Sequence, residues 1–481
     1  MKSRNALIFI TVVMISLGGI SFLFPKEGID IGFRKLYFPA IEDILNGGTT
    51  RSKLALEHLL AMEEELRLQR LRDSLYADSL FNYIAFFEKS PARIDLPDND
   101  YNFFNNIFSD LDSCRQRGEI VRILHYGDSQ IEADRITGYI RQHLQEKFGG
   151  NGPGLLPAVQ AIPAFSAGQS ASENIERYIV AGMHQNQALH GRYGVLGQFG
   201  EMDGVSYISV YVQSTAYENV REFQTIRLFV GRDTNFMARL TLRGTSLENA
   251  TVTASSPVKV YTWNLPRPVS NFSLQMSGSA EIYGIAVDGI SGVAVDNIPF
   301  RGSSGTFFNT LDETVLTSMF QHLNARLIIL EFGGNAVPYM DKNAIDHYCN
   351  SLSRQITFLR NICPEAKFLM IGPSDMSTKV DGQLTSYPLL SYLVEAMKAA
   401  VTQNGAAFWN MYEVMGGHNS MIEWVEHSPA LAAPDYIHFT SKGIERIAAL
   451  FCETLMVYYD YYRFLTKNKE ISCEESPTSE Y

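Results

Sequence analysis

The sequence lacks the short motifs that mark most cofactor-dependent proteins. It has no phosphate-binding loop, no dinucleotide fingerprint and no HExxH pair. Its five cysteines are an odd number and do not have the spacing of metal ligands. We therefore expect no cofactor and no bound metal, and we expect most of the cysteines to be buried or free thiols.

Positive charge is also scarce. The chain has 40 Lys and Arg residues against 52 Asp and Glu residues, so its net charge is -12. There is no basic cluster, RNA-binding signature or zinc-finger spacing, so nucleic acid is not an expected partner. Hydrophobic residues make up 46% and charged residues 19% of the 481 positions, as in ordinary globular proteins. This length is enough for two or three domains.

One long apolar run is present, from Ala6 to Phe24, and two basic residues precede it. Its length is close to the roughly 20 residues that cross a bilayer as a helix. A signal peptide would have a shorter apolar core and a small-x-small cleavage site, although Gly19 and Ser21 leave that alternative open. No cysteine follows the run directly, which argues against a lipoprotein. We expect residues 1–25 to be an uncleaved signal anchor, with the rest of the chain outside the cytoplasm.

Residues 26–94 are expected to form a helical stalk or linker. From about Arg51 to Glu88, leucines and a methionine recur among charged residues, which is typical of a helix that packs against a partner. Two interpretations remain open. The helix is either a stalk, paired with a second copy in a homodimer, or an element that lies on the following domain. Pro91 and Pro97 mark the linker after it.

The most informative stretch is RILHYGDSQIEADRITGYIRQHLQEK, residues 122–147. It begins with a short apolar run typical of a buried strand, which ends at Gly127, Asp128 and Ser129. From Gln130 onward, apolar residues recur at helical spacing, which predicts that Ser129 lies where a strand turns directly into a helix. The unpaired amides and the dipole of a first helical turn would then stabilise an oxyanion beside Ser129.

Two distant stretches contain the other residues that a serine nucleophile needs. PDYIHFTSKG places Asp435 three residues before His438, just ahead of an apolar helix expected at 443–465. LIILEFGGNA ends an apolar strand with glycines and Asn335. A histidine with an ordinary pKa can take the proton of a serine hydroxyl at neutral pH. A carboxylate bound to the other ring nitrogen fixes the tautomer of that histidine.

Together, these three stretches resemble the SGNH, or GDSL-type, hydrolase family. The resemblance implies that Ser129 is the nucleophile, that His438 is its general base and that Asp435 orients the histidine. It also implies an oxyanion hole made by the Ser129 amide, a glycine amide and the Asn335 side chain.

The oxyanion-hole glycine has several candidates in this chain. VDNIPFRGSSG offers Gly302 and Gly305, with Gly292 a little upstream, and we favour Gly302. Two positions depart from the family pattern, because Gln replaces Leu at position 130 and Ala336 stands where Asp is common. Neither change removes a catalytic atom. The expected substrate-binding residues are Asp128, Gln130, Gly334 and His418.

The sequence pattern changes between the stretch that contains Ser129 and the stretch that contains the candidate oxyanion-hole glycines. From about Gly191 to Asp288, short alternating runs such as VSYISVYV and TIRLFVG are separated by clusters of Gly, Asn and Ser. This spacing is typical of an all-β sandwich, which we predict as an insert at 161–290. Four aromatic residues of the insert could stack on sugar rings, although most are expected in its core or in cross-strand pairs. They are Tyr207, Tyr211, Tyr261 and Trp263.

The rest of the chain alternates helices and strands, as a doubly wound sheet does. The predicted fold is therefore α/β, with an SGNH (flavodoxin-like) three-layer parallel sheet, an inserted all-β sandwich and an N-terminal transmembrane helix. The catalytic domain is expected at 95–160 and 291–466, and a disordered tail at 467–481. Further strands are expected at 327–332, 368–371 and 407–412, and further helices at 344–361 and 389–402. The Pro373, Ser374 and Asp375 triplet should lie at a carboxyl end of the sheet.

An SGNH fold interrupted by a β-sandwich after the nucleophile block is similar to bacterial peptidoglycan O-acetylesterases. The resemblance implies a serine esterase that removes O-acetyl groups from a cell-envelope glycan. With the anchor expected from the apolar run at 6–24, we expect this esterase in the bacterial inner membrane, with its catalytic domain in the periplasm. Peptidoglycan and other polysaccharides are both candidate substrates. An O-acyltransferase would use the same triad with a glycan hydroxyl in place of water. A non-catalytic glycan-binding or envelope-assembly protein is a third alternative, supported by the insert, the anchor and the stalk-like helix.

Overall fold

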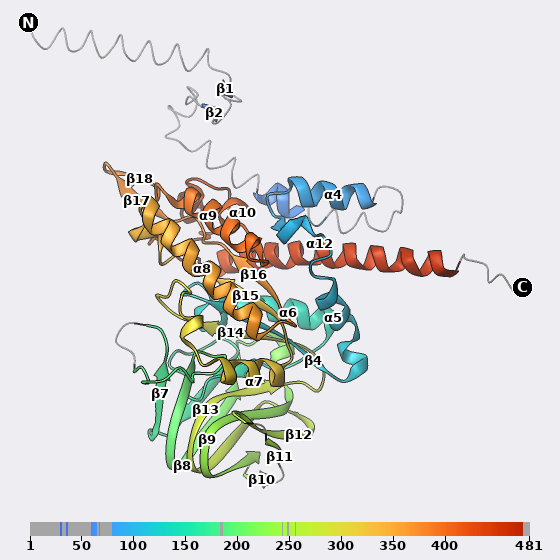
Figure 1. The fold of residues 1–481 in the computed structure, drawn as a ribbon, viewed down its shortest axis with the longest axis vertical. Coiled ribbons are helices and arrows are strands. Elements are labelled where there is room, and N and C mark those ends of the chain that lie inside the picture. Colours follow the sequence, from blue (N-terminus) through green and yellow to red (C-terminus); the bar gives the residue numbers. More distant parts are fainter. Residues whose placement is uncertain are drawn as a thin grey trace, which may run out of the picture.

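A computed structural model gives the fold of the chain (Figure 1). It describes residues 29–30, 35–36, 59–64, 67, 79–182, 186–242, 244–247, 250–254 and 256–474. The predicted membrane anchor at 1–25 lies outside these residues, as do much of the predicted stalk and the last seven residues of the predicted tail. Among the described residues, no helix combines the length and the apolar character needed to cross a membrane.

The α/β domain is built on a six-stranded sheet with the order β14-β4-β15-β16-β19-β3. Five strands are parallel, and β3 pairs antiparallel with β19 at one edge. The strand bounds are Ile94–Asp95 (β3), Ile120–Gly127 (β4), Gly292–Pro299 (β14), Ala325–Glu331 (β15), Lys367–Ile371 (β16) and Ala407–Trp409 (β19). Because β4 is the first of the parallel strands in the chain yet lies between β14 and β15, the strand order reverses beside β4. Sheets of this type bind ligands at the carboxyl ends of the strands at that point.

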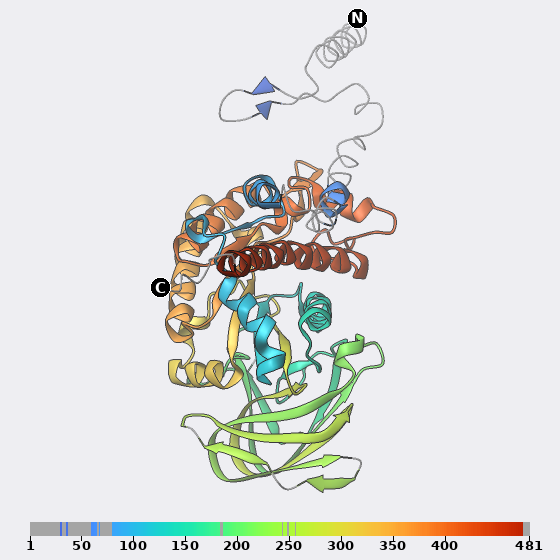
Figure 2. The same cartoon turned by 90° about the vertical axis from the view of Figure 1, so that its right-hand side faces the viewer.

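Helices cover both faces of this sheet, which confirms the three-layer prediction (Figure 2). Strand residues alternate between two cores, so that Ile123 faces one layer of helices and Leu124 faces the other. One layer contains α5 (Asn105–Arg117), α6 (Arg135–Phe148) and α12 (Ser441–Glu474). The other layer contains α7 (Glu313–Leu323), α8 (Lys342–Ile362) and α9 (Leu390–Gln403).

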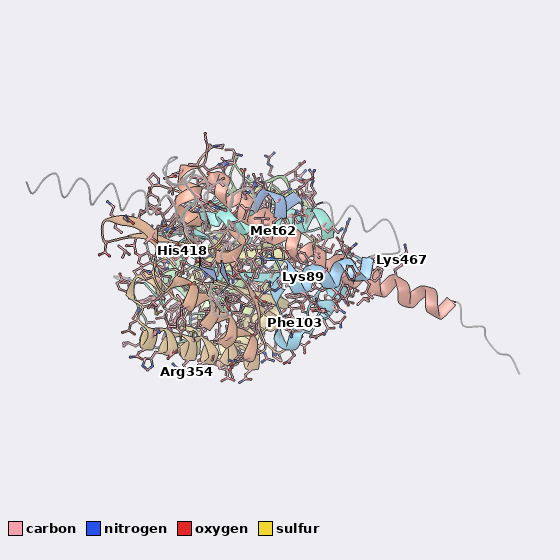
Figure 3. The ribbon with its side chains drawn as sticks, turned by 90° about the horizontal axis from the view of Figure 1, so that it is seen from above. Met62, Lys89, Phe103, Arg354, His418 and Lys467 are labelled. Carbon is pink, nitrogen blue, oxygen red and sulfur yellow. The ribbon has the colours of Figure 1, made fainter. Side chains whose placement is uncertain are left out.

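Two predicted boundaries were wrong. The strand predicted at 407–412 ends at Trp409, because the Asn410 side chain accepts a hydrogen bond from the Glu413 amide and so caps the short helix α10 (Met411–Val414). The predicted disordered tail at 467–481 is also wrong for its first residues. Helix α12 continues to Glu474, through a segment rich in Lys and Glu, which favour helix. Figure 3 shows Lys467 on the part of α12 that projects from the domain.

The smaller elements lie in connecting segments. The hairpin β17–β18 consists of Ser377–Val380 and Gln383–Ser386, and it is followed later in the chain by α11 (Ser420–Glu426). Two further two-residue strands, β1 (Ile29–Asp30) and β2 (Lys35–Leu36), pair with each other.

The insert is one antiparallel sheet of nine strands, which confirms its all-β character. The strand bounds are Gly154–Leu156 (β5), Ala167–Ala171 (β6), Ile175–Ile179 (β7), Gln198–Val212 (β8), Phe223–Leu242 (β9), Thr245–Leu247 (β10), Thr251–Ala254 (β11), Lys259–Val269 (β12) and Asn271–Asp288 (β13). Two separate sheets were expected, but the long strands connect both layers, and the sheet curls over at one end of the molecule (Figure 2). Irregular pairing between β9 and β13 permits this bending. The sheet already begins at residue 154, before the predicted start at 161.

The insert shares its core with the α/β domain. In the second half of β13, Ile282 and Ile285 point into the core of the insert, whereas Tyr283 and Ala286 pack in the core beneath α7 and α8. A strand that is buried on both faces holds the two parts of the chain together.

The four candidate aromatic residues of the insert separate into two pairs. Tyr261 and Trp263 are buried in its core, and Tyr207 and Tyr211 remain about half exposed. Only the second pair is therefore accessible to a partner.

Residues 79–89 of the predicted stalk, together with Leu59 and Met62, lie on the α/β domain. Helix α4 (Ser79–Lys89) packs against α12. The Phe87 ring contacts two other rings, with its centroid 4.6 Å from that of Tyr458 and 4.7 Å from that of Tyr101. Leu59 and Met62 are buried in the same core. Figure 3 shows Met62 and Lys89 over the domain. These residues support the interpretation in which the helix lies on the domain, and pairing with a second copy stays a prediction.

Replacing Phe87 by Leu is expected to lower the free energy of unfolding by about 1–2 kcal/mol. The substitution keeps apolar volume but removes the ring pairs, each of which contributes about 0.5–1.5 kcal/mol. The control is Phe81→Leu on the same helix, because Phe81 is 75% exposed. Urea unfolding of both variants would contradict the predicted packing if their stabilities changed equally.

Candidate active site

Three side chains from distant parts of the sequence form a hydrogen-bonded chain. Ser129 follows strand β4, and its Oγ lies 3.0 Å from Nε2 of His438. Nδ1 of His438 lies 2.7 Å from Oδ2 of Asp435. The other carboxylate oxygen of Asp435 accepts the amides of Ile437 and His438, both at 3.0 Å. With Nδ1 protonated toward Asp435, Nε2 is left to accept the Ser129 proton.

The pKa of Asp435 is lowered in this arrangement. Partial burial acts to raise the pKa of its carboxyl, but the hydrogen bonds from the His438 ring and from the two amides outweigh that effect. Asp435 therefore stays ionised at neutral pH, as an orienting carboxylate must.

The turn after Ser129 differs from the prediction. Helix α6 begins only at Arg135, after a short 3-10 segment in which Ala133 and Asp134 have positive φ angles of 63° and 65°. These two residues interrupt the helix, and Asp134 pairs with Arg141 at 2.6 Å. The expectation that a first helical turn stabilises an oxyanion directly beside Ser129 was therefore wrong. Instead, Arg135 donates a hydrogen bond to the Ser129 carbonyl at 2.6 Å.

The Asn335 side chain lies in the same site and is held by two acceptors. Its Nδ2 donates to Oδ2 of Asp128 at 2.9 Å and to the carbonyl of Ser303 at 3.1 Å. Within the described part of the chain, no hydrogen bond engages the Ser129 N–H. That amide is therefore available to an oxyanion, whereas Asn335 would have to exchange one of its present partners.

A cavity of about 170 Å³ joins these groups. The predicted site residues that line it are Asp128, Ser129, Gln130, Gly334, Asn335 and His438. Pro373 and Ser374 also line it, as their place after β16 predicted, whereas Asp375 is buried and accepts the Met421 amide.

Three predicted site residues do not line this cavity. Asp435 contacts the site only through its hydrogen bond to the His438 ring, and the other two, Gly302 and His418, lie elsewhere. Gly302 is exposed, and only the carbonyl of its neighbour Ser303 reaches Asn335. His418 is exposed on a loop before α11 and is labelled in Figure 3. A loop position in the sequence does not determine which way the loop folds over the sheet edge, so these two assignments find no support in the geometry.

Sequence reasoning missed Glu331 and Tyr339, which also line the cavity. Glu331 is almost completely buried at the end of β15, and its Oε2 lies 3.1 Å from Nε2 of His125. An acidic residue that ends the apolar run LIILE was a signal that could have indicated it. Tyr339 is 85% exposed at the rim, and no sequence pattern distinguishes it.

Burial raises the pKa of Asp128 to about 7, and the nearby Glu331 acts in the same direction. The amide of Gln130 and the side chain of Asn335 donate to this carboxyl and only partly offset the desolvation. The folded protein therefore holds a proton on Asp128 at a pH where the unfolded chain, with a carboxyl pKa near 3.9, has lost it.

This difference predicts the pH dependence of stability. Between about pH 4 and pH 7 the folded state binds more protons than the unfolded state, so raising the pH should lower the free energy of unfolding. In Asp128→Asn this decrease should be smaller by more than about 1 kcal/mol, since one proton contributes up to about 1.4 kcal/mol per pH unit. Asp375 and Glu423, whose pKa values are also raised, remain in both proteins. Identical pH slopes in urea unfolding would contradict this prediction.

The fold and the site together indicate a class of protein. A Ser–His–Asp chain at the carboxyl end of a flavodoxin-like parallel sheet, with Gly and Asn at the end of the neighbouring strand, resembles the SGNH/GDSL type of hydrolase. Among the described residues, no group of three or more His, Cys, Asp or Glu side chains is arranged to hold a metal ion.

Comparisons with known proteins show which solved structures this chain is similar to. No family model and no curated protein matches the sequence. The chain is similar to a solved peptidoglycan O-acetylesterase at 20% identity and a TM-score of 0.59, over 75% of this chain and 96% of that one. A carbohydrate acetylesterase from Sinorhizobium meliloti has 14% identity and a TM-score of 0.25, over 34% of this chain and 78% of that one. A family two carbohydrate esterase from Cellvibrio japonicus has 9% identity and a TM-score of 0.23, over 62% of this chain and 99% of that one. The first similarity establishes a shared fold over 75% of this chain.

Proposed function

We propose that the protein is a serine esterase that removes O-acetyl groups from a cell-envelope glycan, either peptidoglycan or another polysaccharide. The observation that carries the proposal is the hydrogen-bonded chain from Ser129 through His438 to Asp435. The fold shared with a solved peptidoglycan O-acetylesterase supports the choice of substrate class.

The geometry supports a two-step mechanism. The Ser129 oxygen attacks the acetyl carbonyl while its proton passes to Nε2 of His438. The Ser129 amide and one N–H of Asn335 bind the oxyanion, for which Asn335 exchanges its bond to Asp128 or Ser303. When the intermediate collapses, the C–O bond to the sugar breaks and His438 returns the proton to the sugar oxygen. Water, deprotonated by His438, then attacks the acetyl-serine and releases acetate.

The sizes of two cavities support a substrate in which a small acyl group is esterified to a large alcohol. The cavity of about 170 Å³ beside Ser129 is smaller than the roughly 300–1,000 Å³ of typical ligand pockets, which favours a short acyl chain. A second cavity of about 380 Å³ lies between the insert and the α/β domain. It is lined by Glu132 and Arg301 near the nucleophile turn, and by Arg177 and Gln198 of the insert. We place neighbouring sugars of the glycan in this second cavity.

The cellular location of the protein is part of the same proposal. The apolar run at 6–24 would anchor the protein in a bacterial inner membrane, with the esterase domain in the periplasm, where the glycan lies. The packing of α4 and of residues 59–64 on the domain would then hold the active site close to that membrane.

The deciding experiment measures acetate released from O-acetylated peptidoglycan by the purified chain. The control substrate is the same glycan after mild alkaline removal of its esters. Release from the first substrate alone supports the esterase. Transfer of acetyl groups to added glycan, with little free acetate, would identify an acyltransferase that uses the same triad. Binding of the glycan without either reaction would replace the proposal with the glycan-binding alternative.

A further inference from the structure

The side chain of Gln130 bridges the two halves of the proposed active site. It follows the nucleophile directly, and its Nε2 donates to the Ile437 carbonyl at 2.7 Å, across 307 positions of sequence. Ile437 immediately precedes His438, and the amide that joins them donates to Asp435. The Gln130 side chain therefore holds the peptide group from which the histidine extends.

The orientation of this amide is determined by its partner. A carbonyl oxygen only accepts hydrogen bonds, so the Gln130 atom that faces Ile437 must be the nitrogen. The oxygen, Oε1, consequently points elsewhere. It is buried and has no hydrogen-bond partner among the described residues. Gln130 is 8% exposed and lines the cavity with Ser129, Asn335 and His438.

A buried acceptor without a partner is costly unless a ligand supplies the donor. The Ser129 hydroxyl is already directed to His438, and both Nδ2 protons of Asn335 are engaged. Neither of these two donors of the cavity is therefore free for Oε1, and a substrate in the cavity can supply the missing donor. A sugar offers hydroxyl groups and, in an N-acetylhexosamine, an amide N–H close to the ester. A triacylglycerol or a simple alkyl ester offers neither.

We propose that Gln130 is a specificity-determining residue with two separate functions. Its Oε1 accepts a hydrogen bond from an O–H or N–H of the sugar beside the ester, and its Nε2 positions His438 through the Ile437 carbonyl. The inference rests on the proposed esterase function and names the substrate class, esters flanked by hydrogen-bond donors.

The test compares an O-acetylated N-acetylhexosamine with cyclohexyl acetate, which has a six-membered ring but no donor. In Gln130→Met both functions are lost. The kcat should fall roughly tenfold on both esters, and the kcat/KM preference for the sugar ester should fall by a further factor of about ten. Gln130→Glu keeps an acceptor oxygen but loses the donor to Ile437. It should reduce kcat on both esters while retaining the preference for the sugar.

The control is Gln321→Met, because Gln321 is exposed on α7, away from the cavity. If Gln130→Met does not fold, Gln130→Leu, which carries the residue typical of the family, takes its place. The rate at which a fluorophosphonate probe labels Ser129 provides a second readout of the serine and histidine alignment, independent of sugar binding.

Each outcome decides one part of the inference. An equal loss on both esters in Gln130→Met would overturn the acceptor function. An unchanged kcat and labelling rate in both variants would overturn the positioning function. A wild-type chain that is inert toward both esters and the probe would overturn the esterase proposal itself and this inference with it. If the wild type is active and Ser129→Ala abolishes that activity, the esterase proposal stands whatever the Gln130 variants show.

Discussion

Replacing Ser129 by Ala is expected to lower kcat for ester hydrolysis by at least about 10⁴-fold. The substitution removes the attacking oxygen but leaves the His438 and Asp435 pair and the Ser129 backbone amide in place. In serine hydrolases the nucleophile and its base act as one unit, so losing either removes nearly all the benefit of the triad. The measurement is acetate release from an acetylated sugar under single-turnover and steady-state conditions.

The controls for this variant separate chemistry from folding. Ser113→Ala on α5 removes the same atom at a half-buried position outside the cavity, where the hydroxyl donates to the Ser109 carbonyl, and should retain full activity. Ser129→Ala should also retain its thermal stability and its affinity for the acetylated glycan, because binding groups in the cavity are unchanged. Residual hydrolysis within tenfold of the wild type would show that another group is the nucleophile.

Replacing Arg122 by Leu is expected to lower the free energy of unfolding by about 3–5 kcal/mol. Arg122 is completely buried at the start of β4, and its guanidinium binds Asp296 at 2.6 Å and Asp288 at 2.5 Å. Burial acts to lower the pKa of Arg122, but the two carboxylates outweigh it and raise the net pKa. Removing the cation leaves buried negative charge without its main partner, which is the costly way to break a buried ion pair.

The position of this cluster increases the expected effect. Asp288 ends the last strand of the insert, Asp296 lies in β14, and Asp296 also accepts the Leu155 amide, where the insert begins. The Arg122 guanidinium thus joins both ends of the insert to the central strand. The loss should be larger at pH 8 than at pH 5, because burial already raises the pKa of Asp296 and its protonation at low pH would relieve the unpaired charge.

The matched control is Arg117→Leu, in the helix just before β4. Arg117 is 41% exposed and pairs with Asp110 and Glu119 at the surface, so its removal should cost less than about 1 kcal/mol. Urea unfolding monitored by tryptophan fluorescence would measure both variants. Equal losses would contradict the assignment of Arg122 as the buried link between insert and sheet.

The sequence alone determined the features that depend on local chemistry. The apolar run before Ser129 predicted β4, and the apolar segment ending in Glu331 predicted β15. Both predictions were possible because a buried strand consists of consecutive apolar residues. The spacing of Asp435 and His438 predicted their pairing, because three residues in one loop bring a carboxylate to the histidine ring. Alternating runs likewise identified the all-β insert.

Only the tertiary structure decided which distant groups meet. The 3.0 Å contact between Ser129 and His438, and the bond from Gln130 to Ile437, depend on how α12 and its preceding loop pack against the sheet. Local pattern also could not reveal that Ala133 and Asp134 would delay the start of α6, because that backbone is maintained by the buried Asp134–Arg141 pair. Sequence motifs therefore specified the reacting groups, whereas packing between segments 309 positions apart fixed their distances, since those contacts have no local signature.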